Sequence, residues 1–326
     1  MKTTWPELSY AEAHKTYETI HLWTQIVGKI RLVKTPWFNH SWHVTLYVTP
    51  SGFTTSDMVD GEKHFQLDFD FIRHQLRLKT SAGESHSIDL KGLSVAGCYK
   101  QLQDALRQVG IEANINPVPN ELEDPIPFDQ DEIHATYNPE HATALHQAFL
   151  RAHDVFSKFK ARFSGKCSPV HLFWGSFDLA VSRFSGRDAP KHPGGVPNLP
   201  DWVAQEAYSK EVYSCGFWPG SEALPQAAFY SYIYPEPEGF KVARIKPKQA
   251  YYHPELREFI LPYEAVQKAE DPEAMLMDFL QSTYEAAAEL AKWDRRALEQ
   301  EDFSERRKSD QNTYKQVDKR NKEPKD

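Results

Sequence analysis

Cysteine is scarce in this chain of 326 residues, which has only three: Cys98, Cys167 and Cys215. Thiols so few and so scattered predict neither a disulfide framework nor a cysteine-based zinc site, and they fit a reducing, cytoplasmic location. Long apolar runs are also missing. Since no stretch of about 18 apolar residues occurs, we expect no membrane span and no membrane partner. Residues 1–10 lack the apolar stretch of a signal peptide.

Basic residues are outnumbered by acidic ones, 38 to 46, which gives a net charge of -8. Because nucleic acid binding depends on a basic surface, we expect no nucleic acid partner. The glycine-containing motifs of phosphate loops and of serine hydrolases are absent as well. Gly194-Gly195 lies in a Pro-rich stretch without the strand and helix of a phosphate loop. Ser176 lacks the Gly-x-Ser-x-Gly turn of serine hydrolases, and Cys215 has no basic neighbour to activate its thiol.

Aromatic residues, in contrast, make up 13% of the chain. Such residues need burial, an interface or a ligand surface. Several of them form an apolar stripe in a predicted helix that begins at Asn138-Pro139: Leu145, Phe149, Ala152, Phe156, Phe159 and Phe163. Spacings of three and four residues are typical of the buried face of a helix, so these rings are expected to lie together in the core.

Three further helices are predicted from their periodicity and their ends. The first covers residues 10–27, with Ser9 as its N-cap and Glu12 completing a capping box. Another follows Ser94, and the last begins at Asp271-Pro272, where a capping residue precedes a proline in the first turn.

Short alternating stretches between the helices predict strands. They cover residues 43–49, 65–71, 75–79, 170–174, 178–184, 212–218, 229–234 and 258–261. We therefore predict an α+β fold in which antiparallel sheets are packed by about four main helices. Both halves of the chain show the order helix, Gly-Lys, Pro and a strand that begins with His, which suggests two pseudo-repeated halves.

The predicted domain organisation has four parts. An N-terminal α+β half covers residues 1–116, a Pro-rich linker covers 117–137, a C-terminal α+β half covers 138–298, and a disordered charged tail covers 299–326. The last prediction rests on a balance of acidic and basic residues with few large apolar ones, a composition that cannot bury enough surface to order itself.

Polar and aromatic residues are densest over residues 169–187. The candidate catalytic residues from this run and from other segments are His40, His171, Asp178, Arg183, Arg187 and Glu258. The guanidinium groups of Arg183 and Arg187 suit a carboxylate or phosphate ligand, and structural ion pairs are the alternative. In one regular strand Asp178 and Arg183 would point to opposite faces.

A divalent metal is a candidate cofactor, with His43, His171 and His253 as its ligands. His43 and His171 hold matching places in the two proposed halves, so a pseudo-twofold packing would bring them together. Imidazoles with a nearby carboxylate such as Glu258 are the ligand set of zinc and non-haem iron sites. Packed, hydrogen-bonded structural histidines are the alternative.

The candidate ligand-binding residues are His21, Trp23, Lys29, Trp174, Trp218, Tyr230, Tyr232 and Tyr252. They lead to the hypothesis of a small-molecule enzyme or ligand-binding protein with a pocket of His, Arg and aromatic side chains. The alternative is a non-catalytic interaction or scaffold protein whose aromatic residues form a homodimer interface. No reaction or substrate follows from the sequence.

Several longer motifs carry a resemblance to a known family. They are residues 21–29, 39–43, 169–187, 216–220, 229–237, 252–256, 259–266 and 279–288. Through them the chain resembles a bacterial family of conserved proteins, about 300 residues long, with a domain of unknown function. The resemblance extends from Trp5 to Arg295 and leaves the tail outside. It implies that the motifs belong to one folded unit, and it implies no activity.

Overall fold

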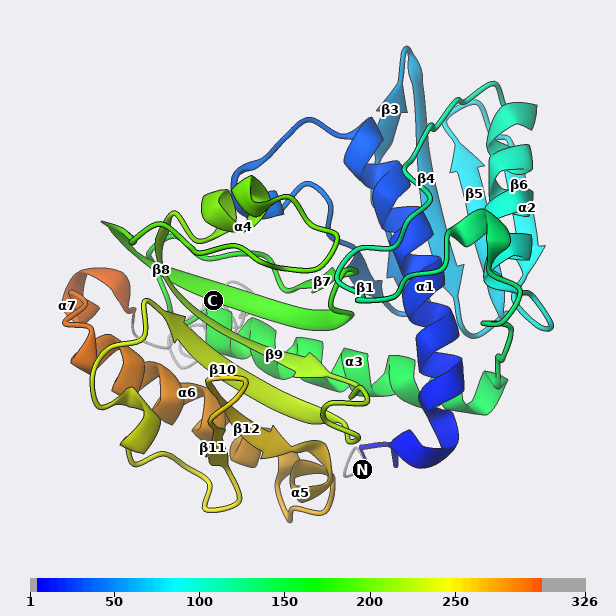
Figure 1. The fold of residues 1–326 in the computed structure, drawn as a ribbon. Coiled ribbons are helices and arrows are strands. Elements are labelled where there is room, and N and C mark those ends of the chain that lie inside the picture. Colours follow the sequence, from blue (N-terminus) through cyan, green and yellow to red (C-terminus); the bar gives the residue numbers. More distant parts are fainter. Residues whose placement is uncertain (1–4, 301–326) are drawn as a thin grey trace, which may run out of the picture.

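The computed structural model describes residues 5–300 of the chain, which form an α+β fold with two antiparallel sheets (Figure 1). The N-terminal sheet has the strand order β1-β2-β4-β5-β6, and β3 pairs with β4. Its strands are β1 (Tyr47–Thr49), β2 (Gly52–Thr54), β3 (Met58–Asp60), β4 (Lys63–Asp70), β5 (Gln75–Thr80) and β6 (Ser85–Asp89). The predicted fold class is therefore confirmed.

The C-terminal sheet has the strand order β11-β12-β10-β9-β8-β7. Its strands are β7 (His171–Phe173), β8 (Asp178–Asp188), β9 (Lys210–Trp218), β10 (Ala228–Tyr234), β11 (Tyr251–His253) and β12 (Glu258–Pro262). The two sheets meet where Leu46 and Leu172 exchange backbone hydrogen bonds of 3.0 and 2.8 Å. This contact fixes the edge of one sheet against the edge of the other.

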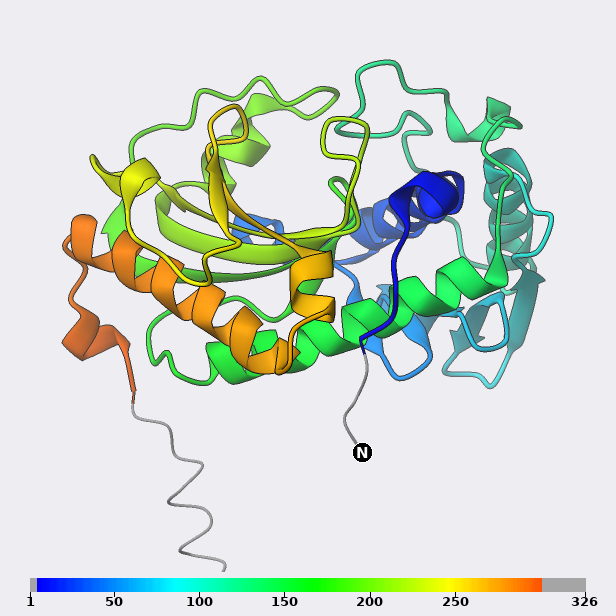
Figure 2. The ribbon, with the colours of Figure 1, turned by 90° about the horizontal axis from the view of Figure 1, so that it is seen from below.

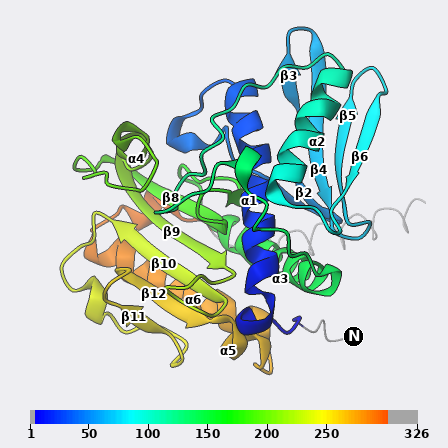
Figure 3. The same ribbon diagram turned by 45° about the vertical axis from the view of Figure 1, so that its right-hand side comes forward.

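The helices surround and separate these sheets. They are α1 (Tyr10–Lys34), α2 (Val95–Gln108), α3 (Pro139–Lys160), α4 (Asp201–Ala207), α5 (Tyr263–Gln267), α6 (Pro272–Leu290) and α7 (Arg295–Leu298), with short 3-10 helices η1 (Asn39–Ser41), η2 (Phe128–Gln130) and η3 (Phe240–Val242). Helices α3 and α6 cover one face of the C-terminal sheet, and α4 with its flanking loops covers the other (Figure 2). Helix α1 runs between the two sheets (Figure 3). Within residues 5–300, no helix is long and apolar enough to cross a membrane.

The starts of the predicted helices are set largely by side-chain caps. Ser94 accepts a hydrogen bond from the Gly97 N–H (3.0 Å), and Asn138 and Asp271 cap α3 and α6 in the same way. Ser9 is the N-cap residue of α1, as predicted, but the predicted capping box is wrong, because the Ser9 side chain makes no capping hydrogen bond. Helix α1 also continues past residue 27 to Lys34.

The helix and sheet faces that point inward form a continuous apolar core that includes residues of both sheets. Phe149, Phe156 and Phe159 on α3 are fully buried, and Phe163, just past the end of α3, is 6% exposed. The predicted stripe is thereby confirmed. The Pro-rich segment 117–137 also packs against this body, since its Phe128 is fully buried. Apart from Glu299 and Gln300, the predicted tail lies outside the described residues.

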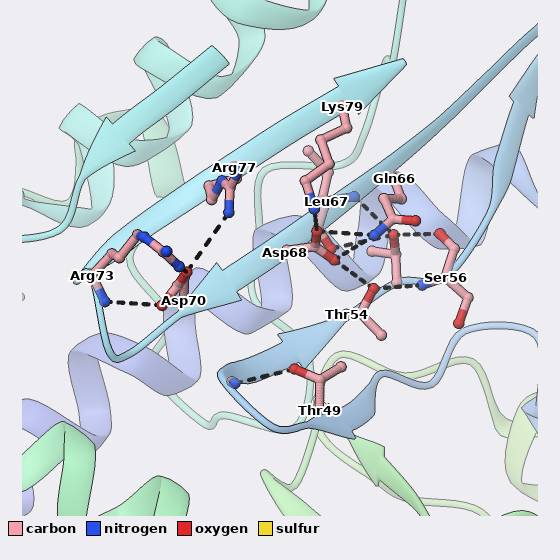
Figure 4. Close-up of polar contacts among 12 residues, drawn as sticks. Thr49, Thr54, Ser56, Gln66, Leu67, Asp68, Asp70, Arg73, Arg77 and Lys79 are labelled. Carbon is pink, nitrogen blue, oxygen red and sulfur yellow. Dashed lines mark hydrogen bonds and ion pairs between the residues drawn. The ribbon is translucent and has the colours of Figure 1, made fainter. Parts of the chain in front are cut away.

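Ion pairs and hydrogen bonds fix the polar residues of the N-terminal sheet (Figure 4). Asp68 on β4 accepts hydrogen bonds from Thr54 on β2 and from Lys79 on β5, both 2.7 Å long. Asp70 caps the turn after β4 by accepting the Arg73 N–H (2.9 Å), and it pairs with the Arg73 side chain. These carboxylates have local cationic partners, which indicates a structural role.

The alternation of side chains along β8 creates the two different faces of the C-terminal sheet. Val181 and Arg183 point toward α3 and α6, whereas Asp178, Ala180 and Ser182 line a cavity on the opposite face. The expected separation of Asp178 from Arg183 onto opposite faces is therefore observed.

Candidate functional site

A cavity of about 400 Å³ lies between the C-terminal sheet and the segment that carries α4. Its floor comes from β7, β8, β9 and β10, and its sides from η1, α4, the loops before α4 and the segment around Glu121. Most of the lining is aromatic or aliphatic. Its aromatic members are Trp37, Trp42, Phe173, Trp174, Phe184, Trp202, Tyr208, Tyr230 and Tyr232. Volume and lining match those of small-molecule sites.

One end of the cavity is built around Asp178 at the start of β8. The Tyr230 hydroxyl on β10 reaches across β9 and donates a hydrogen bond to Asp178 Oδ2, and Ser176 donates to Oδ1 (2.5 Å). Gly216 on β9 makes this possible, because a Cβ atom there would lie 2.4 Å from the Tyr230 hydroxyl. The aspartate is 7% exposed and held by two neutral donors.

Glu121 enters the same end of the cavity from the Pro-rich segment. Its backbone N–H donates to Pro197 O (2.9 Å) on the loop before α4. A Cβ atom at Gly175 would lie 1.8 Å from Glu121 Oε1, so the missing side chain leaves room for this carboxyl. Among the described residues, none donates a hydrogen bond to the Glu121 carboxyl.

A third carboxyl, that of Glu258, belongs to β12 on the same sheet face. Ile260 pairs with Tyr230, and Glu258, two residues away, therefore points to the side of Tyr230. Burial, together with the charge of Asp178, raises the pKa of Glu258 to about 8 and that of Glu121 to about 7. Burial also raises the pKa of Asp178, although Ser176 and Tyr230 oppose the effect. Acids of this kind exchange protons near neutral pH.

Tyrosine hydroxyls extend the polar end. Tyr208, which follows α4, and Tyr232 on β10 place their hydroxyl oxygens 2.8 Å apart, and the Tyr230 and Tyr232 rings are stacked with centroids 6.1 Å apart. Burial raises the pKa of Tyr208 to about 12. The hydroxyls are therefore neutral donors beside the carboxyls.

The opposite end of the cavity contains His40. Its Nδ1 donates to Ala207 O (2.8 Å), so its Nε2 accepts from Lys166 Nζ (2.6 Å). Its backbone N–H donates to the Glu206 carboxylate of α4 (2.8 Å), which ties η1 to α4. Burial lowers the pKa of His40, as expected for a neutral imidazole between these partners.

Trp174 forms a wall between the cavity and α1. Its indole N–H donates to Val44 O (2.8 Å), and its ring lies against Gly28, where a Cβ atom would be 2.2 Å from the indole. The small residue inside α1 thus allows the bulky wall residue to pack against the helix.

A pH-dependent stability follows from Glu258. In the folded state this residue keeps its proton from about pH 4.5 to about pH 8, where the unfolded chain has lost it. The folded state therefore binds more protons over this window, and the free energy of unfolding falls as the pH rises. We expect Glu258→Gln, which stays neutral, to remove roughly 4 kcal/mol of that fall between pH 5 and pH 8.5.

Urea unfolding of both proteins across this pH range measures the difference. Glu255→Gln is a matched control, since Glu255 is exposed on the neighbouring turn. Parallel pH profiles for wild type and Glu258→Gln would show that Glu258 is ionised at neutral pH.

The structure brings several residues expected from the sequence to the cavity: His40, Trp174, Asp178, Tyr230 and Tyr232. Glu258 lies beside this group. Two others support the surrounding backbone. His21 Nε2 is 2.8 Å from Gly175 O, and Lys29 Nζ donates to Val118 O (2.6 Å). Lys29 thereby anchors the segment that carries Glu121.

Three more of the expected ligand-binding residues do not line the cavity. Trp23 is fully buried against Tyr137, Trp218 packs on a small apolar cluster at the end of β9, and the Tyr252 hydroxyl donates to Glu236 (2.6 Å). Their roles in the structure are those of packing and of fixing a strand.

The two arginines do not form the expected clamp. Arg183 is buried on the helix side of the sheet, with its guanidinium carbon 3.4 Å from the Phe159 ring centroid and 4.3 Å from that of Tyr284. Arg187 binds Glu211 (2.6 Å) and Ala291 O at the end of α6. Arg183 lies on the helix side of the sheet because side chains alternate along β8. Arg187 is held by an ion pair on an exposed surface.

We expect the free energy of unfolding of Arg183→Met to lie within about 2 kcal/mol of the wild-type value. An apolar side chain of similar length often replaces a buried charge without loss of stability. Arg183→Ala should be less stable by about 2–4 kcal/mol, since it leaves a void. Urea unfolding compares the three proteins. If a folded Arg183→Met protein lost ligand binding, the result would support the expected role of Arg183 in binding an anion.

The three histidines of the expected metal site do not form one. Residues 5–300 contain no group of three or more His, Cys, Asp or Glu side chains that could hold a metal ion. His43 packs against Trp37 (4.4 Å between centroids), and His253 pairs with Glu258 across β11 and β12. His171 is fully buried beside Phe173 with neither ring nitrogen hydrogen-bonded, and burial lowers its pKa to about 3.

Sequence reasoning missed Glu121 and Tyr208. Both lie in irregular segments, and nothing in the neighbouring residues marks them. For Glu121 the nearest signal is Gly175, which lies opposite it in space, because glycine within or beside a strand indicates a close approach by another group. Which group approaches becomes visible only in the fold.

Fold and site together define an α+β protein with two antiparallel sheets and an aromatic cavity lined at one end by carboxyl groups. The chain belongs to the family of unknown function DUF5996, whose profile matches residues 5–300. The resemblance seen in the sequence is confirmed by this match. Searches of curated proteins and of solved structures gave no match to the chain.

Proposed function

We propose that this protein binds a small molecule in the cavity, with the carboxyl end as the recognition end. The observation that carries the proposal is the placement of Glu121 and Asp178 at one end of an aromatic cavity, with Glu258 beside them and with the pKa of each carboxyl raised. Buried acids without cationic partners lower stability, so their presence in a cavity favours a binding or catalytic role.

The arrangement also supports proton transfer. A carboxyl group with a pKa near 7, such as that of Glu121, gives or takes a proton at neutral pH. Asp178 is held by Ser176 and Tyr230, so it is the fixed acceptor of the pair, whereas the Glu121 carboxyl has its hydrogen-bonding capacity unused. An enzyme of this kind would use Glu121 as the acid or base. A cytoplasmic location remains part of the proposal.

The test is a fragment screen that follows the melting temperature of the wild type and of Ala180→Phe. Ala180 lines the cavity floor, so the larger ring should fill the space and abolish the stabilisation by fragments. Ile72→Ala, at an exposed position in the turn after β4, is the control and should keep the wild-type response. Fragments that stabilise Ala180→Phe as strongly as wild type would place binding elsewhere and contradict the proposal.

A second candidate function is self-association through the aromatic rim of the cavity. Trp37, Phe38 and Trp202 are 43%, 55% and 54% exposed, and the Trp37 and Trp202 rings lie 5.0 Å apart. Exposed aromatic clusters of this kind are common at interfaces. Analytical ultracentrifugation of the wild type and of Trp202→Glu measures the oligomeric state. A wild-type dimer that becomes a monomer in Trp202→Glu supports the interface, and a monomeric wild type contradicts it.

A further inference from the structure

The polar lining of the cavity is unbalanced in charge. At the carboxyl end its titratable groups are Glu121, Asp178 and tyrosine hydroxyls, and none of the described lining residues is Lys or Arg. His40, the basic candidate at the other end, has both ring nitrogens engaged by Ala207 and Lys166. An anionic ligand would therefore meet acids at one end and an occupied imidazole at the other.

The carboxyls have capacity for a hydrogen-bond donor from outside the protein. Among the described residues no donor reaches Glu121, and the two donors to Asp178 leave acceptor sites on its oxygens. A ligand N–H group beside Glu121 and Asp178 would donate the hydrogen bonds that the described residues do not provide. An ammonium group supplies charge as well, and charge-assisted hydrogen bonds are the stronger kind.

The aromatic walls suit the apolar body of such a ligand. Trp42 and Phe184 line the cavity, and the Lys166 ammonium lies 5.3 and 5.2 Å from their ring centroids, so these rings offer apolar surface and the carboxyl end is left for a ligand's charge. Tryptophan faces attract organic cations and also pack against flat apolar groups. Trp174 offers a further large ring near Gly175 and Glu121.

We propose that the ligand is an organic amine with a flat apolar body, its ammonium group between Glu121 and Asp178 and its body among the tryptophan rings of the cavity. This inference rests on the proposed function and names the ligand class for the same cavity.

A proton linkage accompanies this mode of binding. A cation stabilises the ionised carboxyls, so protons leave as it binds near neutral pH. The groups around Glu121 are Asp178 and Glu258 from the sheet, Tyr208, Tyr230 and Tyr232, and His21 and Lys29 behind the loop. With Glu121 as the main titrating group, affinity for an amine should rise about tenfold from pH 6 to pH 8.

Isothermal titration with three probes of one skeleton tests the inference: tryptamine, its alcohol tryptophol and the anion indole-3-acetate. We expect tryptamine to bind at least tenfold more tightly than tryptophol, and indole-3-acetate most weakly. Glu121→Gln should lower tryptamine affinity at least tenfold and leave tryptophol unchanged. Glu123→Gln, an exposed neighbour on the same loop, is the matched control. Heats measured in buffers of different ionisation enthalpy should show proton release.

Equal binding of tryptamine and tryptophol, or tighter binding of the anion, would overturn the cation inference and leave the small-molecule cavity intact. Failure of tryptamine to bind would also overturn it. The proposed function itself fails only if the fragment screen finds nothing that Ala180→Phe blocks, so the two failures are distinguishable.

Discussion

Replacing Phe156 by alanine should lower the free energy of unfolding by about 3–5 kcal/mol. Phe156 is fully buried where α3 packs under the C-terminal sheet, and its ring meets that of Phe229 edge to face, with centroids 6.3 Å apart. Truncation removes apolar contacts and leaves a void that helix and sheet cannot close. Urea unfolding followed by far-ultraviolet circular dichroism measures the change.

Phe38→Ala is the matched control for this prediction. The same truncation at a side chain that is 55% exposed should change stability by less than about 0.5 kcal/mol. A loss below about 1 kcal/mol for Phe156→Ala would mean that α3 does not seal the sheet, and the assignment of the opposite face to the cavity would fail with it.

Gly216→Ala should destabilise the protein by about 1–3 kcal/mol and also disable the cavity. The new Cβ atom would lie 2.4 Å from the Tyr230 hydroxyl and 2.5 Å from Leu179 O. Tyr230 therefore has to leave Asp178, and that aspartate loses one of its two donors. We expect the affinity for any cavity ligand to fall at least tenfold, as measured by isothermal titration.

A double-mutant cycle separates the ring from the backbone in this effect. If Tyr230 is the group displaced, Gly216→Ala should cost less stability in a Tyr230→Ala background than in the wild type. An equal cost in both backgrounds would assign the clash to Leu179 O and show that Tyr230 does not depend on the glycine.

The parts of the fold that could be predicted are those set by local rules. Capping at Ser94, Asn138 and Asp271 fixed three helix starts, because the signal and its effect lie within a few residues. Strand alternation likewise separated Asp178 from Arg183. The predicted first helix ends at residue 27, whereas α1 continues to Lys34 and Trp174 packs against Gly28 within it.

The site could be predicted only in part, because it depends on contacts between distant segments. Asp178 was found from the density of polar and aromatic residues over residues 169–187, and Tyr230 was found as an aromatic candidate for the wall of a pocket. Glu121 was not, because its place opposite Gly175 is set by the fold of a proline-rich segment with no periodicity. The histidine site failed for the same reason: matching positions in two halves do not make the side chains meet. The proposed duplication of the halves stays a prediction.

A crystal structure of the protein soaked with amine-containing and neutral aromatic fragments tests the central claim most directly. The account predicts ordered fragments on the cavity floor within hydrogen-bonding distance of Glu121 or Asp178, with their rings against Trp42 or Trp174. Fragments found only on the exposed rim of Trp37 and Trp202, with the carboxyl end filled by water alone, would contradict it.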